Sequence, residues 1–192
     1  MSSIKFMFFF LIIAFCASSC KTDYEKYVER ELSSNVKNDS IIFGLYLGMP
    51  RYDYFERCWH LNHNKVVGSG NGTFVEYIDR DDEVQDKTKK KKLLFQGIFD
   101  DKKIMRGMEM RYSYFTWSPW LKNRQSDTLV ADLLIHLMQK YKGNDFIEIT
   151  LEEFNKKAYV KIDGNRQILM YPKTAAEVMV KVEDLPYKLS QR

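Results

Sequence analysis

A predicted helix in the second half of the chain constrains the fold most, because its apolar face is too wide to be left in water. Its apolar side chains recur every three or four residues and are Leu129, Val130, Leu133, Leu134, Leu137, Met138 and Tyr141. We expect Ser126 or Asp127 to cap this helix and Gly143 to end it. Such a helix must pack against a sheet.

Strand candidates follow this helix, as the packing argument requires. Alternating or short apolar runs cover residues 146–152, 158–162, 167–171 and 178–182. Asp163-Gly164 lies between two of these runs, and an Asp-Gly pair in that position is typical of a tight hairpin.

The first half of the chain has a similar order. Residues 41–49 read as a strand, and Pro50 begins a helix that runs to about residue 62. The spacing of Met49, Tyr52, Phe55 and Trp59 predicts one buried stripe on this helix.

Three more strand candidates follow, at residues 73–78, 93–100 and 106–117. In the last of them one face carries Met108, Met110, Tyr112 and Tyr114. The sequence therefore predicts an α+β fold, with one antiparallel sheet and two helices on one face. The order of elements is also that of a tandem repeat of a helix-plus-meander unit.

The N-terminus has the order of a secretory signal. Lys5 precedes an apolar run over residues 6–15, and small residues follow it. The run is about half of the ~20 residues that a membrane-spanning helix needs. We therefore expect residues 1–19 to be removed as a signal peptide.

The end of this segment, Ala17-Ser18-Ser19-Cys20, resembles the lipobox of bacterial lipoproteins, although leucine is commonest where Ala17 stands. The resemblance implies cleavage between Ser19 and Cys20 and attachment of acyl chains such as palmitate to Cys20. Two or three chains would hold a soluble domain on a membrane. Lys21, in place of the aspartate that retains lipoproteins at the inner membrane, favours the outer membrane.

The cysteine count agrees with a cleaved and acylated N-terminus. Once Cys16 is removed and Cys20 is acylated, only Cys58 remains, so no disulfide forms within one mature chain. Residues 20–41 read as a lipidated tether with a short helix, and residues 42–192 as one α+β domain.

The formal net charge of +4 is too small to indicate nucleic-acid binding. The lysine-rich run 87–92 follows the acidic run 79–86, which can neutralise it in a solvated loop.

The segment FGLYLGMPRYDYFERC, residues 43–58, resembles the beginning of outer-membrane lipoprotein domains of the BamE/SmpA type. A tandem version of that unit resembles the β-lactamase-inhibitor-protein fold. Gly48 and Met49 match as structural positions, whereas Pro50 replaces the usual Ser or Thr cap. The resemblance implies a binding scaffold and no catalytic residue.

Candidate chemistry is sparse. Cys58, His60 and His63 are suitable zinc ligands by type, but on a helix only the two histidines could share a face. We find no nucleophile elbow, phosphate-binding loop or dinucleotide motif, and therefore expect no metal, no cofactor and no catalytic residue.

The segment YSYFTWSPW, residues 112–120, is the best candidate binding surface. Trp117 and Trp120 flank a Ser-Pro turn, with Tyr114 nearby, and such rings either contact a partner or seal the edge of the sheet. We therefore expect an outer-membrane lipoprotein that binds another envelope protein and is not an enzyme. The alternatives are a glycan-binding accessory protein, which requires both tryptophans to be exposed, and an enzyme with a dispersed site.

Overall fold

The computed structural model describes residues 22–82, 84, 86–151 and 155–191. The chain divides into two compact units, residues 1–30 and 31–192. Helix α2 (Asp23–Ser33) begins in the first unit, where the Thr22 hydroxyl accepts a hydrogen bond from Glu25 N and the Glu25 carboxylate accepts one from Thr22 N. Of the helices described, none has the length and hydrophobicity needed to cross a membrane.

The second unit is built on one antiparallel sheet, in which the described strands have the order β1-β2-β3-β4-β8-β7-β6-β5. The α+β class and the antiparallel sheet are therefore confirmed. The strands are β1 (Gly68–Ser69), β2 (Val75–Ile78), β3 (Lys91–Phe99), β4 (Met105–Tyr114), β5 (Ile147–Leu151), β6 (Lys156–Asp163), β7 (Arg166–Pro172) and β8 (Glu177–Asp184).

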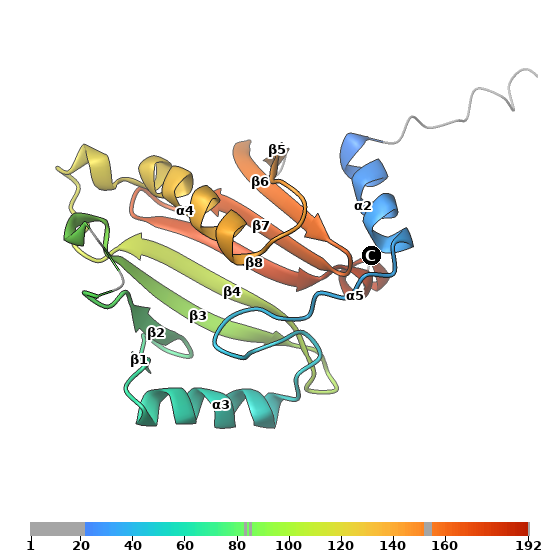
Figure 1. The fold of residues 1–192 in the computed structure, drawn as a ribbon, viewed down its shortest axis with the longest axis horizontal. Helices are drawn as coiled ribbons and strands as arrows, with labels where there is room; N and C mark the ends of the chain where they lie inside the picture. The colour runs from blue at the N-terminus through green and yellow to red at the C-terminus, as the bar shows by residue number, and fades with distance from the viewer. Residues whose placement is uncertain (1–21, 83, 85, 152–154, 192) are drawn as a thin grey trace, which may run out of the picture. The chain divides into compact units, whose positions relative to one another are not determined.

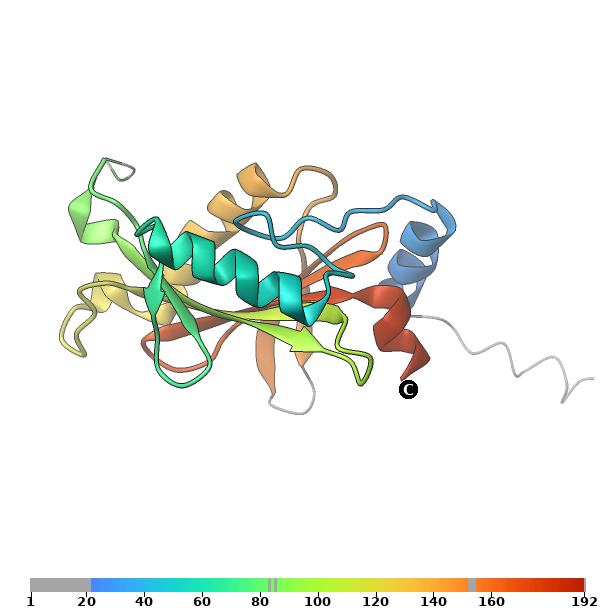
Figure 2. The same ribbon diagram turned by 90° about the horizontal axis from the view of Figure 1, so that it is seen from below.

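The helices of this unit are α3 (Arg51–His63), α4 (Ser126–Lys140) and α5 (Leu185–Ser190), with short 3-10 turns η1 (Lys87–Lys89) and η2 (Lys122–Arg124). In Figure 1, α4 crosses in front of the strands and α3 lies beside the end of the sheet that carries β1 and β2. Seen from below, in Figure 2, α3 is nearest the viewer and runs along the β3–β4 hairpin.

One hydrophobic core joins the sheet to both long helices. The predicted face of β4 is confirmed, since Met108, Met110, Tyr112 and Tyr114 are all buried. Their neighbours across the sheet on the same face are Phe95 on β3 and Val180 on β8, both fully buried. The apolar stripe of α4 completes this core through Leu129, Val130, Leu133 and Leu137.

The predicted hairpin at Asp163 forms and carries an unusual charge cluster. Asp163 pairs with Arg166 across the turn, and Gly164 adopts a φ of +59°, which glycine tolerates best. The side chain of Lys161 is 0% exposed and its ammonium lies 3.1 Å from the Asp163 carboxylate. The Arg166 guanidinium lies 3.5 Å from the same carboxylate. Two cations thus share one buried anion.

The predicted strand over residues 41–49 is wrong. This segment is a winding loop in which Phe43, Gly44 and Gly48 have positive φ values of 51°, 78° and 87°. Its apolar side chains are buried all the same, with Leu45 at 0% exposure. The glycines let the backbone turn back on itself, so an apolar run that reads as a strand is packed as a loop.

The boundaries of α4 also differ from the prediction. Its N-cap is Gln125, which makes no side-chain capping bond, and the amide of Ser126 donates instead to the carbonyl of Ala175. The helix ends before Tyr141, so Gly143 lies beyond the cap and approaches Asp163. Tertiary contacts replace the local capping bond that Ser126 or Asp127 was expected to make.

The buried charge cluster predicts a large effect of Asp163→Asn. This substitution keeps the shape of the side chain but leaves Lys161 and Arg166 without a buried counter-charge. We expect the free energy of unfolding to fall by about 3–5 kcal/mol, measured by urea denaturation.

The matched control for this substitution is Glu148→Gln. It breaks the Lys157–Glu148 pair, whose side chains are 61% and 53% exposed. An exposed pair of this kind contributes about 0–1 kcal/mol. Equal losses in the two variants would show that the buried cluster has no special role in stability.

Candidate functional site

Helix α3 presents a row of aromatic rings to solvent. Tyr52, Phe55 and Trp59 are 76%, 53% and 60% exposed and follow the i, i+3, i+7 spacing of one helix face. The prediction that this stripe is buried is wrong, apart from Met49, which lies before the helix and is buried. The buried side chains of α3 are Tyr54, Cys58 and Leu61. We call the row of Tyr52, Phe55 and Trp59 the aromatic ridge.

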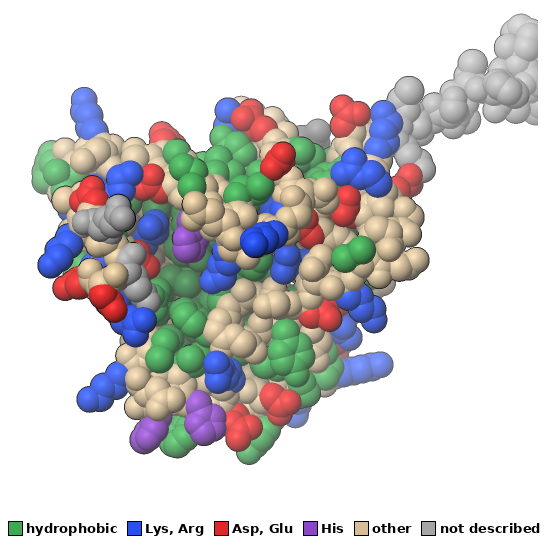
Figure 3. Space-filling model, viewed as in Figure 1, with side chains coloured by type: hydrophobic (Ala, Val, Ile, Leu, Met, Phe, Trp, Pro, Cys, Tyr) green, Lys and Arg blue, Asp and Glu red, His purple; other side chains and the backbone are tan. Residues whose placement is uncertain are grey.

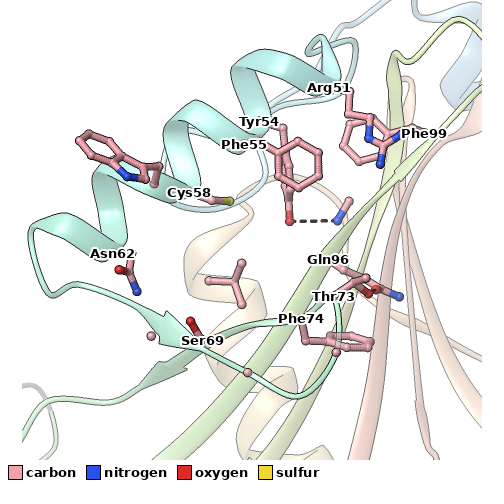
Figure 4. Close-up of a pocket in the computed structure, with 16 residues that line it drawn as sticks. Arg51, Tyr54, Phe55, Cys58, Asn62, Ser69, Thr73, Phe74, Gln96 and Phe99 are labelled. Atoms are coloured by element: carbon pink, nitrogen blue, oxygen red, sulfur yellow. Dashed lines mark hydrogen bonds between the residues drawn. The ribbon is translucent and has the colours of Figure 1, made fainter.

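Two residues of the ridge, Phe55 and Trp59, line a groove of about 550 Å³ between α3, the β1–β2 hairpin and β3 (Figure 4). We call it the α3 groove. Its lining is mainly aromatic, glycine and neutral polar, and Arg51 is its one charged side chain among the described residues. Phe55 and Trp59 come from α3, Phe74 and Val75 from the hairpin, and Phe99 from β3.

The two reactive groups on the floor of the groove, the Tyr54 hydroxyl and the Cys58 thiol, are both held in unreactive states. The Tyr54 hydroxyl accepts a hydrogen bond from Gly97 N on β3 at 3.1 Å, and Figure 4 shows the ring reaching across to that strand. Burial raises the pKa of the Cys58 thiol, more than Tyr54 and Arg57 lower it. The thiol is therefore protonated near neutral pH and is a poor nucleophile.

A cationic aromatic cluster forms the N-terminal end of the groove. The rings of Phe55 and Phe99 stack with their centroids 6.5 Å apart. The guanidinium carbon of Arg51 lies 5.4 Å from the first centroid and 5.8 Å from the second. These distances fit cation–π contacts, which hold the arginine over exposed aromatic surface.

The two histidines lie at the other end of α3. His63 stacks on the Trp59 ring at 5.2 Å with an interplanar angle of 9°, and His60 meets the same ring edge-on at 5.0 Å. Both histidines are exposed, whereas Cys58 is buried. Within the part of the chain that the structure describes, no group of three or more His, Cys, Asp or Glu side chains is placed to hold a metal ion.

The β1–β2 hairpin supplies the opposite wall of the groove. Gly68 and Ser69 form β1, which pairs with Glu76 and Val75 of β2. A Cβ at Gly70 would lie 2.8 Å from the carbonyl oxygen of Phe74, so this turn leaves no room for a side chain. The side-chain amide of Gln96 on β3 accepts a hydrogen bond from the Thr73 hydroxyl at 2.5 Å and donates one to the Glu109 carboxylate at 3.4 Å.

The three residues of the predicted binding surface, Tyr114, Trp117 and Trp120, differ in exposure. Tyr114 is only 2% exposed and its hydroxyl donates to Asp132 at 2.8 Å, which ties β4 to α4. Trp117 is half-buried, and its indole Nε1 is enclosed without a hydrogen-bond partner. Trp120 is 87% exposed, so one of the three rings is free to contact a partner.

Two other predictions concern the lipid-attachment segment and the charged loop. Ser19 and Cys20 lie outside the described residues. Two lysines of the basic run pair with the preceding acidic run, Lys90 with Asp81 at 2.9 Å and Lys91 with Asp79 at 3.7 Å. The mutual neutralisation expected for this loop is confirmed at these two pairs.

No protein-family model, curated protein or solved structure matches this chain. The resemblance of residues 43–58 to BamE/SmpA-type domains therefore stays a prediction.

The ridge could have been found from the sequence by counting rings. Residues 52–59 contain Tyr52, Tyr54, Phe55 and Trp59, which cannot all lie on one narrow helix face. One subset had to be exposed. The spacing alone does not say which, because both subsets recur at helical intervals.

The exposure of the ridge predicts that it contributes little to stability. We expect Trp59→Ala to change the free energy of unfolding by less than about 1 kcal/mol, since the ring is 60% exposed. Tyr54→Ala, five residues earlier and at a position that is 3% exposed, should cost about 3–5 kcal/mol. Chemical denaturation of both variants compares the two faces of α3, and a large loss in Trp59→Ala would assign the ridge to the core.

Proposed function

We propose that the protein is an outer-membrane lipoprotein, anchored through Cys20, whose domain binds another envelope protein through the aromatic ridge and the α3 groove. The order of basic, apolar and small residues before Cys20 supports the anchor. The proposal includes no enzymatic activity, no metal and no cofactor.

One observation carries the proposed binding role, namely three large aromatic side chains exposed on one face of a well-packed helix. The buried side chains of Tyr54, Cys58 and Leu61 hold α3 on the core, so the helix does not need the ridge to stay packed there. Tyr and Trp are enriched among the residues that carry most binding energy in protein interfaces. The adjoining groove gives a partner's side chain a place to insert.

A protein partner is favoured over a glycan because the polar groups of the groove are largely engaged. Gln96 is bonded to Thr73 and Glu109, and Asn62 donates to the carbonyl of Val67 at 3.2 Å. A sugar needs hydrogen-bond partners for its hydroxyls as well as a ring to stack on. The glycan alternative now rests on Trp120 alone, since Trp117 is half-buried.

The state of the polar groups supports a binding role in place of catalysis. Cys58 is buried with a raised pKa, and both exposed histidines contact the Trp59 ring, His63 by stacking and His60 by its edge. Asp100 is held by Arg106 at 2.9 Å and by the amide of Ile104 at 2.9 Å. A catalytic acid or nucleophile needs a group that is free to react.

We also infer the finer architecture predicted from the sequence, with both long helices on one face of a duplicated sheet. Tyr54 and Leu61 of α3 share a hydrophobic cluster with Leu133 of α4. Each helix is followed by four described strands, and β4 and β8, the last of each set, pair at the centre of the sheet. This order is what a tandem helix-plus-meander unit gives when its two copies join edge to edge.

The anchor predicts that Cys20 carries the lipid. Metabolic labelling of the host with an alkyne palmitate analogue should label the wild-type protein and not Cys20→Ala. Acylation is confined to Cys20 because Cys16 is removed with the signal and Cys58 is buried. Equal labelling of Cys58→Ala serves as the control. Unchanged labelling of Cys20→Ala would contradict the proposed anchor.

The docking surface predicts site-specific crosslinking. A photo-reactive benzoylphenylalanine at Tyr52 in the full-length protein should form a discrete adduct with one envelope protein in intact cells. The same group at Trp120, which is also exposed, is the matched control and should not form it. We expect Phe55→Ser with Trp59→Ser to remove the Tyr52 adduct while the domain remains folded. An adduct from Trp120 alone would move the binding site away from α3.

A further inference from the structure

A second pocket lies between α4 and the β2–β3 pair. It has a volume of about 690 Å³, within the range of small-molecule sites. Figure 3 shows hydrophobic side chains on the floor of a hollow below α4. Tyr77, Leu93 and Tyr112 line it from the sheet, and Ile135, His136 and Lys140 line it from the helix.

The floor of this pocket is aromatic, with one weakly bonded polar group. The rings of Phe43 and Tyr77 lie 5.1 Å apart at an angle of 55°. Tyr112 is 5% exposed, and within the described parts of the chain its hydroxyl donates only to the sulfur of Met110, at 4.0 Å. A sulfur acceptor at that distance is weak, so the hydroxyl keeps the capacity to donate to a ligand.

The three lysines of the pocket lining are matched in number by three aspartates, but Lys140 is outside the ion pairs that they form. Lys89 pairs with Asp132 at 3.2 Å, and Lys91 pairs with Asp79 at 3.7 Å. Lys140 has no carboxylate within 4.0 Å among the described residues. Its ammonium instead lies 5.9 Å from the centroid of the Phe43 ring.

Lys140 and the neighbouring His136 both have lowered pKa values. Burial lowers the pKa of Lys140, and burial followed by Lys140 and Lys91 lowers that of His136. Asp79 acts in the opposite direction on the histidine. An anion beside the two groups would reverse these shifts, because it stabilises their protonated forms.

We propose that this pocket binds an amphipathic anion, with its apolar or aromatic body on the floor and its single anionic group between Lys140 and His136. The unpaired ammonium provides the charge complementarity, and Phe43, Tyr77 and Leu93 provide the apolar surface. Asp79, Asp86 and Asp132 in the same lining disfavour a polyanion, which would meet like charges. This site is separate from the α3 groove and does not depend on the proposed partner.

Two dyes with nearly the same ring system provide the test. 1-Anilinonaphthalene-8-sulfonate carries the anion, and N-phenyl-1-naphthylamine lacks it. Fluorescence titration of the intact protein should show that Lys140→Met weakens sulfonate binding by about tenfold, the loss of one charge-assisted contact. The same substitution should leave binding of the neutral dye within about twofold. Lys142→Met is the matched control, since this exposed lysine does not line the pocket.

The ring protons of His136 give an independent measurement by NMR. The sulfonate should raise the pKa of His136, and the neutral dye should not, so sulfonate affinity falls as pH rises through this pKa. The groups that set this pKa are Lys140 on the same helix and Lys91 and Asp79 on the sheet side. Failure of either dye to bind, equal losses for both dyes in Lys140→Met, or loss of binding in Trp59→Ala would overturn the proposal.

Discussion

The Asp163 carboxylate is the constraint on which much of this domain depends. It contacts Lys161 and Arg166 and accepts a hydrogen bond from the amide of Asn144 at 2.8 Å. Asn144 lies between α4 and β5, so one buried anion fixes the hairpin and the end of the helix together. Buried ion pairs cost much to desolvate, and removal of one partner is strongly destabilising because it leaves an uncompensated buried charge.

The same cluster positions the segment before α3. The Arg166 guanidinium donates to the carbonyl of Ser40 at 2.8 Å, and the amide of Asn38 donates to the side chain of Asn165 at 2.6 Å. From there the loop pairs with the β3–β4 turn, where Gly48 N donates to Met105 O at 2.8 Å. Helix α3 therefore begins at a fixed point. Its apolar edge packs inward and its ridge is left outside.

How far the sequence predicts this fold depends on whether a feature is local. The faces of β4, the Asp163 hairpin and the apolar stripe of α4 were predictable, because period and turn chemistry are properties of neighbouring residues. The pairing of β4 with β8 joins residues far apart in the chain and leaves no local signal. Lys161 is a similar case, because nothing in a strand pattern indicates that a lysine will be fully buried.

The candidate sites were harder to predict than the fold for a related reason. A helix with two aromatic stripes satisfies the same periodicity whichever stripe is buried, and the choice was made by the contact of Tyr54 with Gly97 on β3. The unpaired state of Lys140 depends on which aspartates reach Lys89 and Lys91, and that is set by the packing of η1 against α4. In both cases the sequence shows which contacts a side chain could make, and only the packing decides which of them it makes.

The two sites share one wall, and this limits how they can influence each other. Val75 lines the α3 groove and Tyr77 lines the second pocket, two residues apart on the same face of β2. Phe95 is fully buried, pairs with Val75 across the sheet and packs on Phe43, whose ring also packs on Tyr77. Protein interiors are close-packed, and coupling between two sites requires an element with two discrete arrangements. The fold therefore holds an aromatic surface on α3 and a pocket with an unpaired lysine on α4 against the same sheet.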